Sequence, residues 1–351
     1  MASASALGWI LPLGIGGSVA AAGLSLAHMD VKDLAVRFAT GPGRTSRILL
    51  ALFVVLNWKS MPLMWTYRVL GAIVRQWLPA LRPARLEPRQ LFHFSITSTY
   101  NTLLETDYNM HKSNSTYFAD LDVSRSHCVT HLLKPGMDAL SNNATSKHPC
   151  VLTPDGKPAR GGLGIGLGAV FCSFKREVAI GQGYELWTRI LAWDRKWVYI
   201  VTYFVVKGKV KPRAWDAGQG LGKKSWFGPV RGGRTSESGR EKEEGFEKYV
   251  IASAVSKYVF KMGRFTVHPA ILLDQSGLLP ARDGGWVGGE NDVWDEQKKG
   301  EGEDSNEWTW QRIETQRREG MRFASKFAGL DGLSGVFDGG DDGALGRFYP
   351  G

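Results

Sequence analysis

The chain has 351 residues, of which 43% are hydrophobic and 22% are charged. This content is enough for one large core or two small ones, and it excludes a chain that is disordered throughout. Lysine and arginine (44) exceed aspartate and glutamate (34), so the net charge is +10; this permits a polyanionic partner, an anionic membrane or a phosphorylated cofactor without selecting among them.

Three cysteines, Cys128, Cys150 and Cys172, form an odd number at unrelated spacings and make no CxxC pair. This pattern supports neither a disulfide framework nor a thiolate zinc site. A reducing compartment fits it best, and we expect no metal ion.

The N-terminal region, residues 1–86, carries two signals of membrane association. Residues 2–27 contain no charged side chain, and residues 8–27 match the ~20 residues that a helix needs to cross a bilayer. Residues 34–86 contain no acid, and their arginines and tryptophans surround a short apolar run, 48–56, which is typical of a helix at headgroup level. We therefore expect a membrane-associated protein whose downstream domain faces the cytosol. The alternative is a basic amphipathic helix that packs on the protein's own surface.

The main domain is predicted over residues 87–280. Residues 92–105 are rich in Ser, Thr and aromatic side chains, as a strand would be, and residues 115–133 place apolar side chains at helical spacing. Strand followed by long helix followed by antiparallel strands is the α+β class. Four further strand-like segments predict an antiparallel meander over residues 162–177, 184–192, 197–206 and 249–260.

Two polar stretches interrupt or follow this domain. Residues 207–248 are predicted to be a flexible insertion, basic at first and rich in Gly and Ser, and residues 281–307 an acidic Gly-rich loop. The basic stretch could contact coenzyme A phosphates or nucleic acid, but its few aromatics favour a solvated loop, and we expect no nucleic-acid partner. The C-terminal region, residues 308–351, is predicted to contain a helix and a tail. The candidates for the buried face of that helix are Trp310, Ile313, Phe323, Phe327 and Leu330.

The densest polar cluster, residues 105–125, falls where a strand end gives way to a helix start. Backbone N–H groups in the first turn of a helix have no intrahelical partner, so they can polarise a carbonyl oxygen. Asp107, four residues before His111, could activate a water or attack the same carbonyl. From the residues alone, the alternative is that Asp107 only caps the turn.

The segment 107–125 resembles the signature of hotdog-fold thioesterases of the 4-hydroxybenzoyl-CoA thioesterase type, through Asp107, His111, Asn114, Tyr117 and Arg125. With the run NWKSMPLMW at 57–65 and the segment 252–269, the chain is similar to fungal thioesterase-like proteins of secondary-metabolite gene clusters, the lcsJ family. Relatives often carry two Asn after the His, whereas this chain has Ser113 and then Asn114.

The resemblance implies a hotdog fold, in which a curved antiparallel sheet wraps a long central helix, paired into a homodimer. It implies that Asp107 is the base or nucleophile, with His111 and Asn114 as further catalytic residues. Ser113, Ser115 and Tyr117 would bind the substrate. Two roles stay open: His111 either supports the loop or makes a catalytic hydrogen bond, and Glu105 is either a second carboxylate near the site or, as we favour, a solvated residue at a strand end.

We therefore predict an acyl thioester hydrolase that acts on acyl-CoA or on an acyl carrier protein, in secondary or lipid metabolism, without a metal or redox cofactor. The alternative is a non-catalytic, membrane-tethered hotdog module that binds acyl chains or a partner protein.

Overall fold

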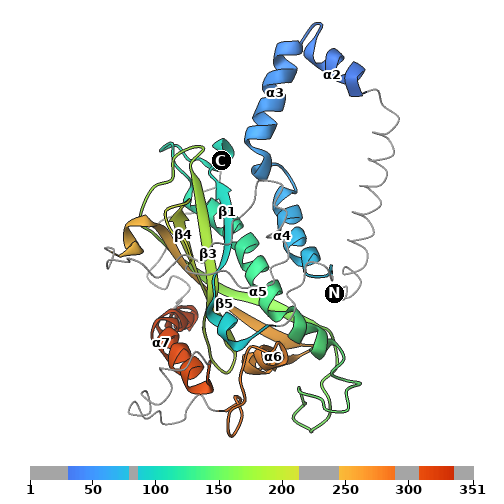
Figure 1. Ribbon diagram of the computed structural model, residues 1–351, viewed down its shortest axis with the longest axis vertical. Coiled ribbons are helices and arrows are strands. Elements are labelled where there is room, and N and C mark those ends of the chain that lie inside the picture. Colours follow the sequence, from blue (N-terminus) through green and yellow to red (C-terminus); the bar gives the residue numbers. More distant parts are fainter. Residues whose placement is uncertain (1–30, 79–85, 213–244, 289–307, 336–351) are drawn as a thin grey trace, which may run out of the picture. The chain divides into compact units, whose positions relative to one another are not determined.

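The computed structural model describes residues 31–78, 86–212, 245–288 and 308–335 (Figure 1). These residues form two compact units. The first unit contains the described residues up to Leu70, together with Tyr100–Ala119 and Val178–Gln182. The second unit contains all the other described residues, and it includes the sheet and most of the longest helix.

The second unit is built on one sheet with strand order β1-β3-β4-β5-β2, and a short strand, β6, pairs with β5. The pairs β3/β4, β4/β5 and β2/β5 are antiparallel. β4 and β5 bury most of their side chains, which suits their central place in the sheet. The strands are β1 (Ser95–Tyr100), β2 (Leu163–Phe174), β3 (Gly183–Trp193), β4 (Trp197–Val206), β5 (Val250–Met262) and β6 (Phe265–Val267).

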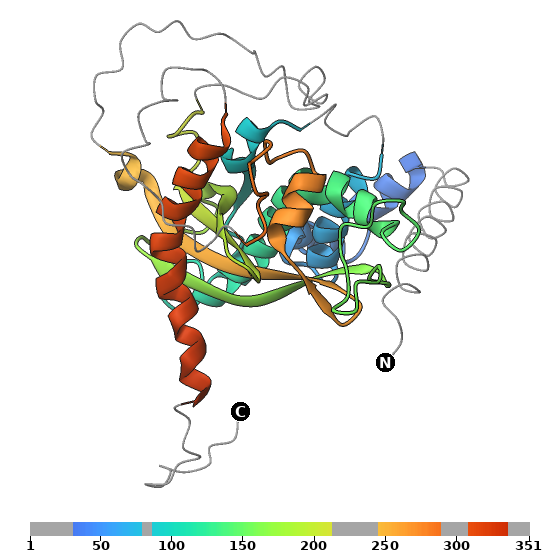
Figure 2. The same ribbon diagram turned by 90° about the horizontal axis from the view of Figure 1, so that it is seen from below.

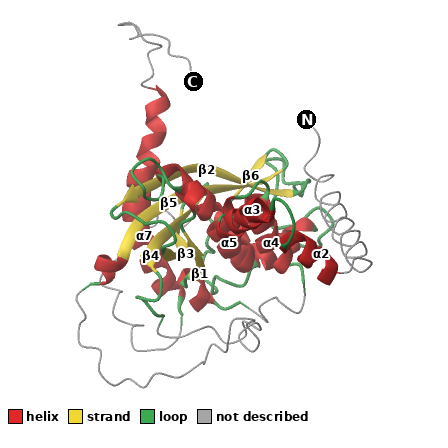
Figure 3. Ribbon diagram, turned by 90° about the horizontal axis from the view of Figure 1, so that it is seen from above, coloured by secondary structure: helices red, strands yellow, loops and turns green. Residues whose placement is uncertain are grey.

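Helix α5 (Tyr117–Ser141) lies against one face of this sheet, and helix α7 (Trp310–Ala328) lies on the other side (Figure 3). Successive side chains of a strand point to opposite faces, and β5 illustrates this. Ser256 accepts a hydrogen bond from Arg125 of α5, at 2.6 Å, whereas Lys257 contacts the ring of Phe327 in α7. This arrangement confirms the predicted α+β hotdog fold, with a curved antiparallel sheet around a long helix.

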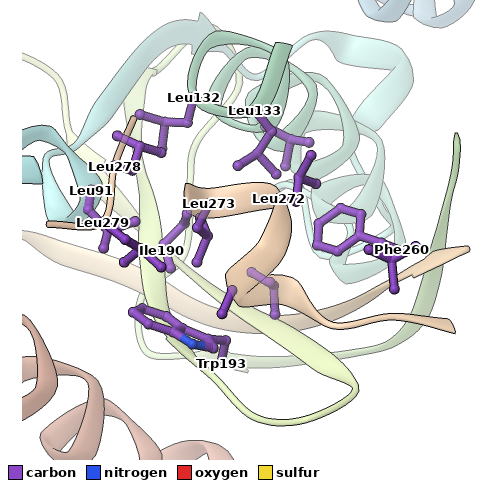
Figure 4. Close-up of a cluster of buried hydrophobic side chains, with 14 of the residues drawn as sticks. Leu91, Leu132, Leu133, Ile190, Trp193, Phe260, Leu272, Leu273, Leu278 and Leu279 are labelled. Carbon is purple, nitrogen blue, oxygen red and sulfur yellow. The ribbon is translucent and has the colours of Figure 1, made fainter. Parts of the chain in front are cut away.

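The hydrophobic core lies between α5, the sheet and the short helix α6 (Pro269–Gln275) (Figure 4). Leucines from α5 and α6 face each other across it, and aromatic side chains of the strands close its far side. The side chains of this cluster that Figure 4 labels are Leu91, Leu132, Leu133, Ile190, Trp193, Phe260, Leu272, Leu273, Leu278 and Leu279.

Helix α7 packs closely on β3, as Figure 2 shows in red. A Cβ atom added at Gly320 would lie 2.1 Å from the carbonyl oxygen of Leu191, so only glycine permits this approach. Arg317 donates to the carbonyl of Trp193 at 2.9 Å and to the fully buried carboxylate of Glu314. Burial alone would raise the pKa of Glu314, but the hydrogen bonds and charges of Arg317 and Arg318 outweigh it and lower the pKa.

The first unit begins with helices α2 (Val31–Ala39) and α3 (Arg44–Leu56), and α4 (Met64–Arg75) starts in it. The guanidinium of Arg47 donates to the backbone carbonyls of Arg37, Phe38, Thr40 and Pro42, which satisfies the C-terminal end of α2. The apolar run 48–56, which the sequence predicts as a helix, lies within α3. None of the residues of α3 is buried.

The predicted membrane association, with the catalytic domain facing the cytosol, is wrong on the described residues. In that part of the chain, no helix combines the length and the apolar character that crossing a bilayer requires. Helix α3 has 13 residues, so it is about 20 Å long, whereas the hydrocarbon core is about 30 Å thick. The segment predicted to span, residues 8–27, lies outside the described residues.

The predicted strands agree well with β2 to β5, and 197–206 coincides with β4. The meander is confirmed for β3, β4 and β5 but is wrong for β2, which pairs with the outer edge of β5. Helix α5 continues past Pro135 to Ser141, beyond the predicted end. The neighbouring Gly136 brings its backbone close to α6, where its N–H donates to Ser276 Oγ at 3.1 Å.

The predicted buried face of the C-terminal helix is wrong in part. Ile313 is buried, but Phe323 is 67% and Leu330 is 50% exposed. The inner face of α7 instead includes Glu314 and Arg317, because their mutual ion pair makes burial of both charges possible.

Candidate active site

The loop that carries Asp107 is closed at its base by backbone hydrogen bonds. Ser113 N–H donates to the Glu105 carbonyl at 2.8 Å, and Asp107 N–H donates to the His111 carbonyl at 3.0 Å. Between these two bonds, Thr106 and Lys112 form an isolated antiparallel bridge. The loop therefore has a short two-stranded stem with Asp107 and His111 next to its tip.

The tip is a tight turn. Met110 N–H donates to the Asp107 carbonyl at 3.0 Å, and Met110 has a positive φ of 65°, which is uncommon outside glycine. The carboxylate oxygen Oδ1 of Asp107 accepts the N–H of Asn109 at 2.9 Å. Tyr108, at the tip, is 92% exposed.

Asp107 and His111 meet on this loop. Nδ1 of His111 lies 3.6 Å from Oδ1 of Asp107, and each side chain is 24% exposed. This distance exceeds a hydrogen bond but suits an ion pair when the imidazole is protonated. The contact places a partly exposed carboxylate beside an imidazole, which are two groups suited to general acid–base chemistry.

The chain passes from this loop directly into the helix start. Ser113 precedes a 3₁₀ turn, Asn114–Thr116, which continues as α5 at Tyr117. The hydroxyls of Ser113 and Ser115 lie 3.0 Å apart, and the Thr116 N–H donates to the Ser113 carbonyl at 3.0 Å. Asn114 and Ser115 are exposed. The predicted site residues thus lie on one continuous segment, in which the contacts of the described residues join Asp107 to His111 but not to Asn114.

Tyr117 is 2% exposed, and its ring lies under the ammonium of Lys112, with Nζ 5.2 Å from the ring centroid. Lys112 is itself 1% exposed. Its ammonium lies 3.0 Å from Oε2 of Glu105, and the ammonium of Lys59 lies 2.7 Å from the same oxygen. Glu105 is therefore a buried member of an ionic cluster, and the favoured prediction of a solvated strand-end residue is wrong.

The segment Asn57–Ser60, part of the NWKSMPLMW run, supplies further contacts that sequence reasoning missed. Oδ1 of Asn57 accepts the N–H of Leu104 at 3.0 Å, and the hydroxyl of Ser60 lies 2.6 Å from that of Thr102. The only signal for them was the resemblance of that run to the fungal family, which names no partner for these side chains.

Asn101 is a second residue that sequence reasoning missed. It is fully buried, and its side-chain NH₂ donates to the carbonyls of Val178 and Ala179 at 3.1 and 3.3 Å. Lys112 N–H donates to the same Val178 carbonyl at 2.9 Å, and His111 forms a bridge with Ala179. The turn 178–182 is thus linked both to the end of β1 and to the Asp107 loop.

No group of three or more His, Cys, Asp or Glu side chains suited to a metal ion occurs in the described part of the chain. Cys128 of α5 is buried, and burial raises the pKa of its thiol to about 12, so it is a poor nucleophile. The groups suited to chemistry are those of the Asp107 loop and the helix start.

Comparisons with known proteins also point to the segment that contains the Asp107 loop. The model of the thioesterase-like superfamily matches residues 102–221, which include the whole Asp107 loop. The chain is 34% identical over 302 residues to the probable thioesterase atnL of Emericella nidulans, across 84% of this chain and 89% of that protein. It is 34% identical over 284 residues to the thioesterase poxG of Penicillium oxalicum, across 80% and 82%.

A third curated relative is the thioesterase lcsJ of Purpureocillium lilacinum, which is 30% identical over 320 residues, across 81% of this chain and 90% of that protein. Among solved structures, a gentisyl-coenzyme A thioesterase aligns with 52% of this chain and 98% of its own, at 13% identity and a TM-score of 0.30. Because the chain shares about a third of its residues with these fungal proteins over nearly their whole length, it belongs to the thioesterase-like superfamily and is a thioester hydrolase.

Proposed function

We propose that this thioesterase hydrolyses acyl thioesters of coenzyme A or of an acyl carrier protein, and that Asp107 carries the reaction. The observation that supports this proposal is the Asp107–His111 contact on a loop that runs directly into the first turn of α5. A carboxylate and a set of helix-start amides, separated by a few residues, supply the two functions that thioester hydrolysis needs.

Asp107 can act in either of two ways. As a general base, it takes a proton from water while the water oxygen attacks the thioester carbonyl carbon. The C–S bond then breaks, and the leaving sulfur takes the proton from the Asp107 carboxyl to give the acid and the thiol. As a nucleophile, it attacks the carbonyl carbon itself and displaces the sulfur as a thiolate. Water then hydrolyses the resulting mixed anhydride, which releases the acid, regenerates the Asp107 carboxylate and supplies the proton that the thiolate takes up. Both routes consume one water and need no cofactor.

The negative charge that develops on the carbonyl oxygen requires donors that are already in place. The backbone N–H groups at the helix start, from Ser113 to Ser115, carry the positive end of the helix dipole. Because the Ser113 N–H already donates to the Glu105 carbonyl, we assign the oxyanion to the N–H groups of Asn114 and Ser115, and we assign the hydroxyls of Ser113 and Ser115 to the substrate. Asn114, exposed at the same turn, is in reach of a substrate that approaches from solvent.

His111 serves chiefly to support the loop in this proposal. Its carbonyl accepts the Asp107 N–H and its backbone bridges to Ala179, and both contacts fix the stem. Tyr117, buried under Lys112, contributes to the site through packing.

The remaining parts of the proposal concern organisation. We take residues 87–280 as the catalytic domain, with 1–86 preceding it, 207–248 as an insertion, and 281–307 and 308–351 following it. We also propose a homodimer. Within the described residues β2 pairs only with β5, so it forms one edge of the sheet. Its 12 residues contain no charged side chain, and an uncharged edge strand of this length is a template for pairing.

The proposal is tested by a thiol-release assay on a panel of acyl-CoA chain lengths and on acyl carrier protein, with the full chain and with Asp107→Asn. Loss of the general base is expected to lower kcat by about 10²–10⁴, with an unchanged melting temperature. The matched control, Asp155→Asn, removes an exposed carboxylate in another loop and should leave kcat unchanged. Equal kcat in the Asp107 variant would remove Asp107 from the mechanism. Saturable acyl binding with no thiol release by the wild-type chain would instead favour a binding module.

A further inference from the structure

The base of the Asp107 loop contains three charged side chains that are buried away from water. The side chains of Lys59, Glu105 and Lys112 are 5%, 9% and 0% exposed. Two ammonium groups share one carboxylate oxygen, so the cluster contains more positive than negative charge. Burial of charged groups costs free energy unless they are paired. The three side chains must therefore keep the positions in which the ammonium groups contact the carboxylate.

The cluster coincides with the stem of the loop. Glu105 accepts the Ser113 N–H through its backbone and contacts the Lys112 ammonium through its side chain, so two independent contacts join the two sides of the stem. The stem adjoins the two residues proposed for chemistry, because Asp107 lies two positions after Glu105 and His111 immediately precedes Lys112. A shift of the stem would therefore move both Asp107 and His111.

Lys59 adds a contact from a distant part of the sequence. It belongs to the 3₁₀ turn Trp58–Ser60, and Asn57 occupies the N-cap position of this turn. Asn57 Oδ1 accepts the Leu104 N–H, and Ser60 Oγ contacts Thr102 Oγ1. Three side chains of the segment Asn57–Ser60 thus contact the residues Thr102–Glu105, which follow β1 and lead to Asp107. The arrangement fixes Thr102–Glu105 in place before the loop begins.

We propose that Lys59, Glu105 and Lys112 are positioning residues for thioester hydrolysis: together with the Asn57–Ser60 turn, they fix the stem of the loop that presents Asp107. This inference rests on the proposed function of Asp107. It goes beyond that function because it gives a positioning role to residues that take no part in the proposed chemical steps. None of the three contacts the reacting atoms in this scheme. Their contribution is geometric, and a misplacement of about 1 Å costs about 10²-fold in rate.

The test compares Lys59→Met with the wild-type chain. Methionine fills the space of the lysine's methylene stem but removes the ammonium group, and it leaves the Glu105–Lys112 pair intact. We expect kcat to fall by about 10- to 100-fold, with KM within about threefold because substrate contacts are unchanged. Hydrogen exchange should be faster at the Asp107 and Ser113 amides, which donate to His111 and Glu105. If Lys59 only stabilised the fold, Lys59→Met would lower the melting temperature without lowering kcat relative to KM.

Two further variants sharpen the result. Arg37→Met is the matched control, because it removes one positive charge from an exposed ion pair with Asp33 in α2. It should change neither kcat nor the hydrogen-exchange rates of the Asp107 loop. Lys59→Met combined with Glu105→Gln should cost no more in kcat than Glu105→Gln alone, because both act through one contact. If Lys59→Met fails to fold, Ser60→Ala weakens the same turn without unpairing a charge and should give a smaller fall in kcat, again with faster exchange.

The outcomes separate the two proposals. Wild-type kcat and wild-type exchange in Lys59→Met would overturn the positioning role. A wild-type chain without thioesterase activity would overturn the proposed function. In that case the exchange rates still decide whether the cluster fixes the loop, since protection of the Asp107 and Ser113 amides does not depend on turnover.

Discussion

Oxygen Oε2 of Glu105 lies 2.7 Å from the ammonium of Lys59, and the ammonium of Lys112 contacts the same oxygen at 3.0 Å. The three side chains are therefore not equivalent. Removal of Glu105 takes away the carboxylate that both lysines contact, whereas removal of Lys59 leaves one buried pair with matched charges.

This asymmetry predicts the order of two stability changes. Glu105→Gln should destabilise the fold by about 3–5 kcal/mol, the usual cost of breaking a buried pair. Lys59→Met should cost clearly less, since methionine packs in the space of the lysine stem and the Glu105–Lys112 pair survives. Urea unfolding of both variants measures the difference. Equal losses, or a larger loss in Lys59→Met, would contradict the shared-carboxylate arrangement.

The cluster also marks where sequence reasoning reached its limit. Asp107 and His111 are four residues apart on one loop, so their proximity follows from local geometry and could be predicted. Glu105 is expected in solvent from the sequence because it lies at the end of a predicted strand, whereas its partner Lys59 lies in a distant segment. A long-range pair between two charged residues leaves no periodic signal in a single sequence, and only the fold brings the two together.

The packing of α7 on β3 gives a second prediction. A Cβ at Gly320 would lie 2.1 Å from the Leu191 carbonyl oxygen and 2.9 Å from the carbonyl carbon. Alanine favours a helix over glycine by about 1 kcal/mol, but the clash with backbone requires α7 to move away from the sheet. Gly320→Ala should therefore destabilise the fold by about 1–3 kcal/mol, measured by urea unfolding.

Gly329 is the matched control for Gly320. It ends the same helix with an ordinary right-handed φ of −58°, and nothing lies within 4 Å of an added Cβ. Gly329→Ala should change stability by less than about 0.5 kcal/mol. If both variants were neutral, the close approach of α7 to β3 would be wrong.

The strands and this helix also differ in how well the sequence predicts them. β4 was predicted to the residue because its apolar and aromatic side chains end sharply at Asp194–Lys196 and at Lys207. The inner face of α7 was predicted only in part, because hydrophobicity selects Phe323 rather than Gly320 and Glu314. A glycine and an ion pair face the sheet there, for reasons of close approach and charge pairing that no hydrophobic pattern contains.

The ion pair of α7 predicts a pH dependence. The pKa of Glu314 is lowered in the folded chain, since the effects of Arg317 and Arg318 outweigh that of burial. A carboxyl whose folded pKa lies below its unfolded value contributes stability that is fully present above the unfolded value, about 4.3. That contribution is lost as pH falls through the folded value.

Glu314→Gln should accordingly destabilise the chain by about 3 kcal/mol at pH 7. The gap in the free energy of unfolding between this variant and the wild type should narrow as the pH falls below about 4. Urea unfolding across a pH series measures it. Glu319→Gln changes an exposed carboxyl of the same helix and should show no such gap. A gap in Glu314→Gln that stays constant from pH 7 to pH 3 would mean that the carboxylate does not stabilise the fold through its charge.

Among the strands that the structure describes, β2 pairs only with β5, and its other edge predicts a surface for a second copy of the chain. β2 exposes three apolar side chains, Leu167, Phe171 and Phe174, at 45%, 47% and 38%. An edge strand with these side chains and no charge pairs readily with another strand, and a lysine at such an edge opposes pairing. If the proposed homodimer forms through this edge, Phe171→Lys should shift it to monomer in analytical ultracentrifugation, with little change in the unfolding midpoint at low concentration. The matched control, Phe323→Lys, changes a phenylalanine of α7 that is 67% exposed and should leave the dimer intact, because that side chain lies on a helix, away from any strand edge. A dimer that survives Phe171→Lys and dissociates in Phe323→Lys would place the interface on α7 instead of on β2.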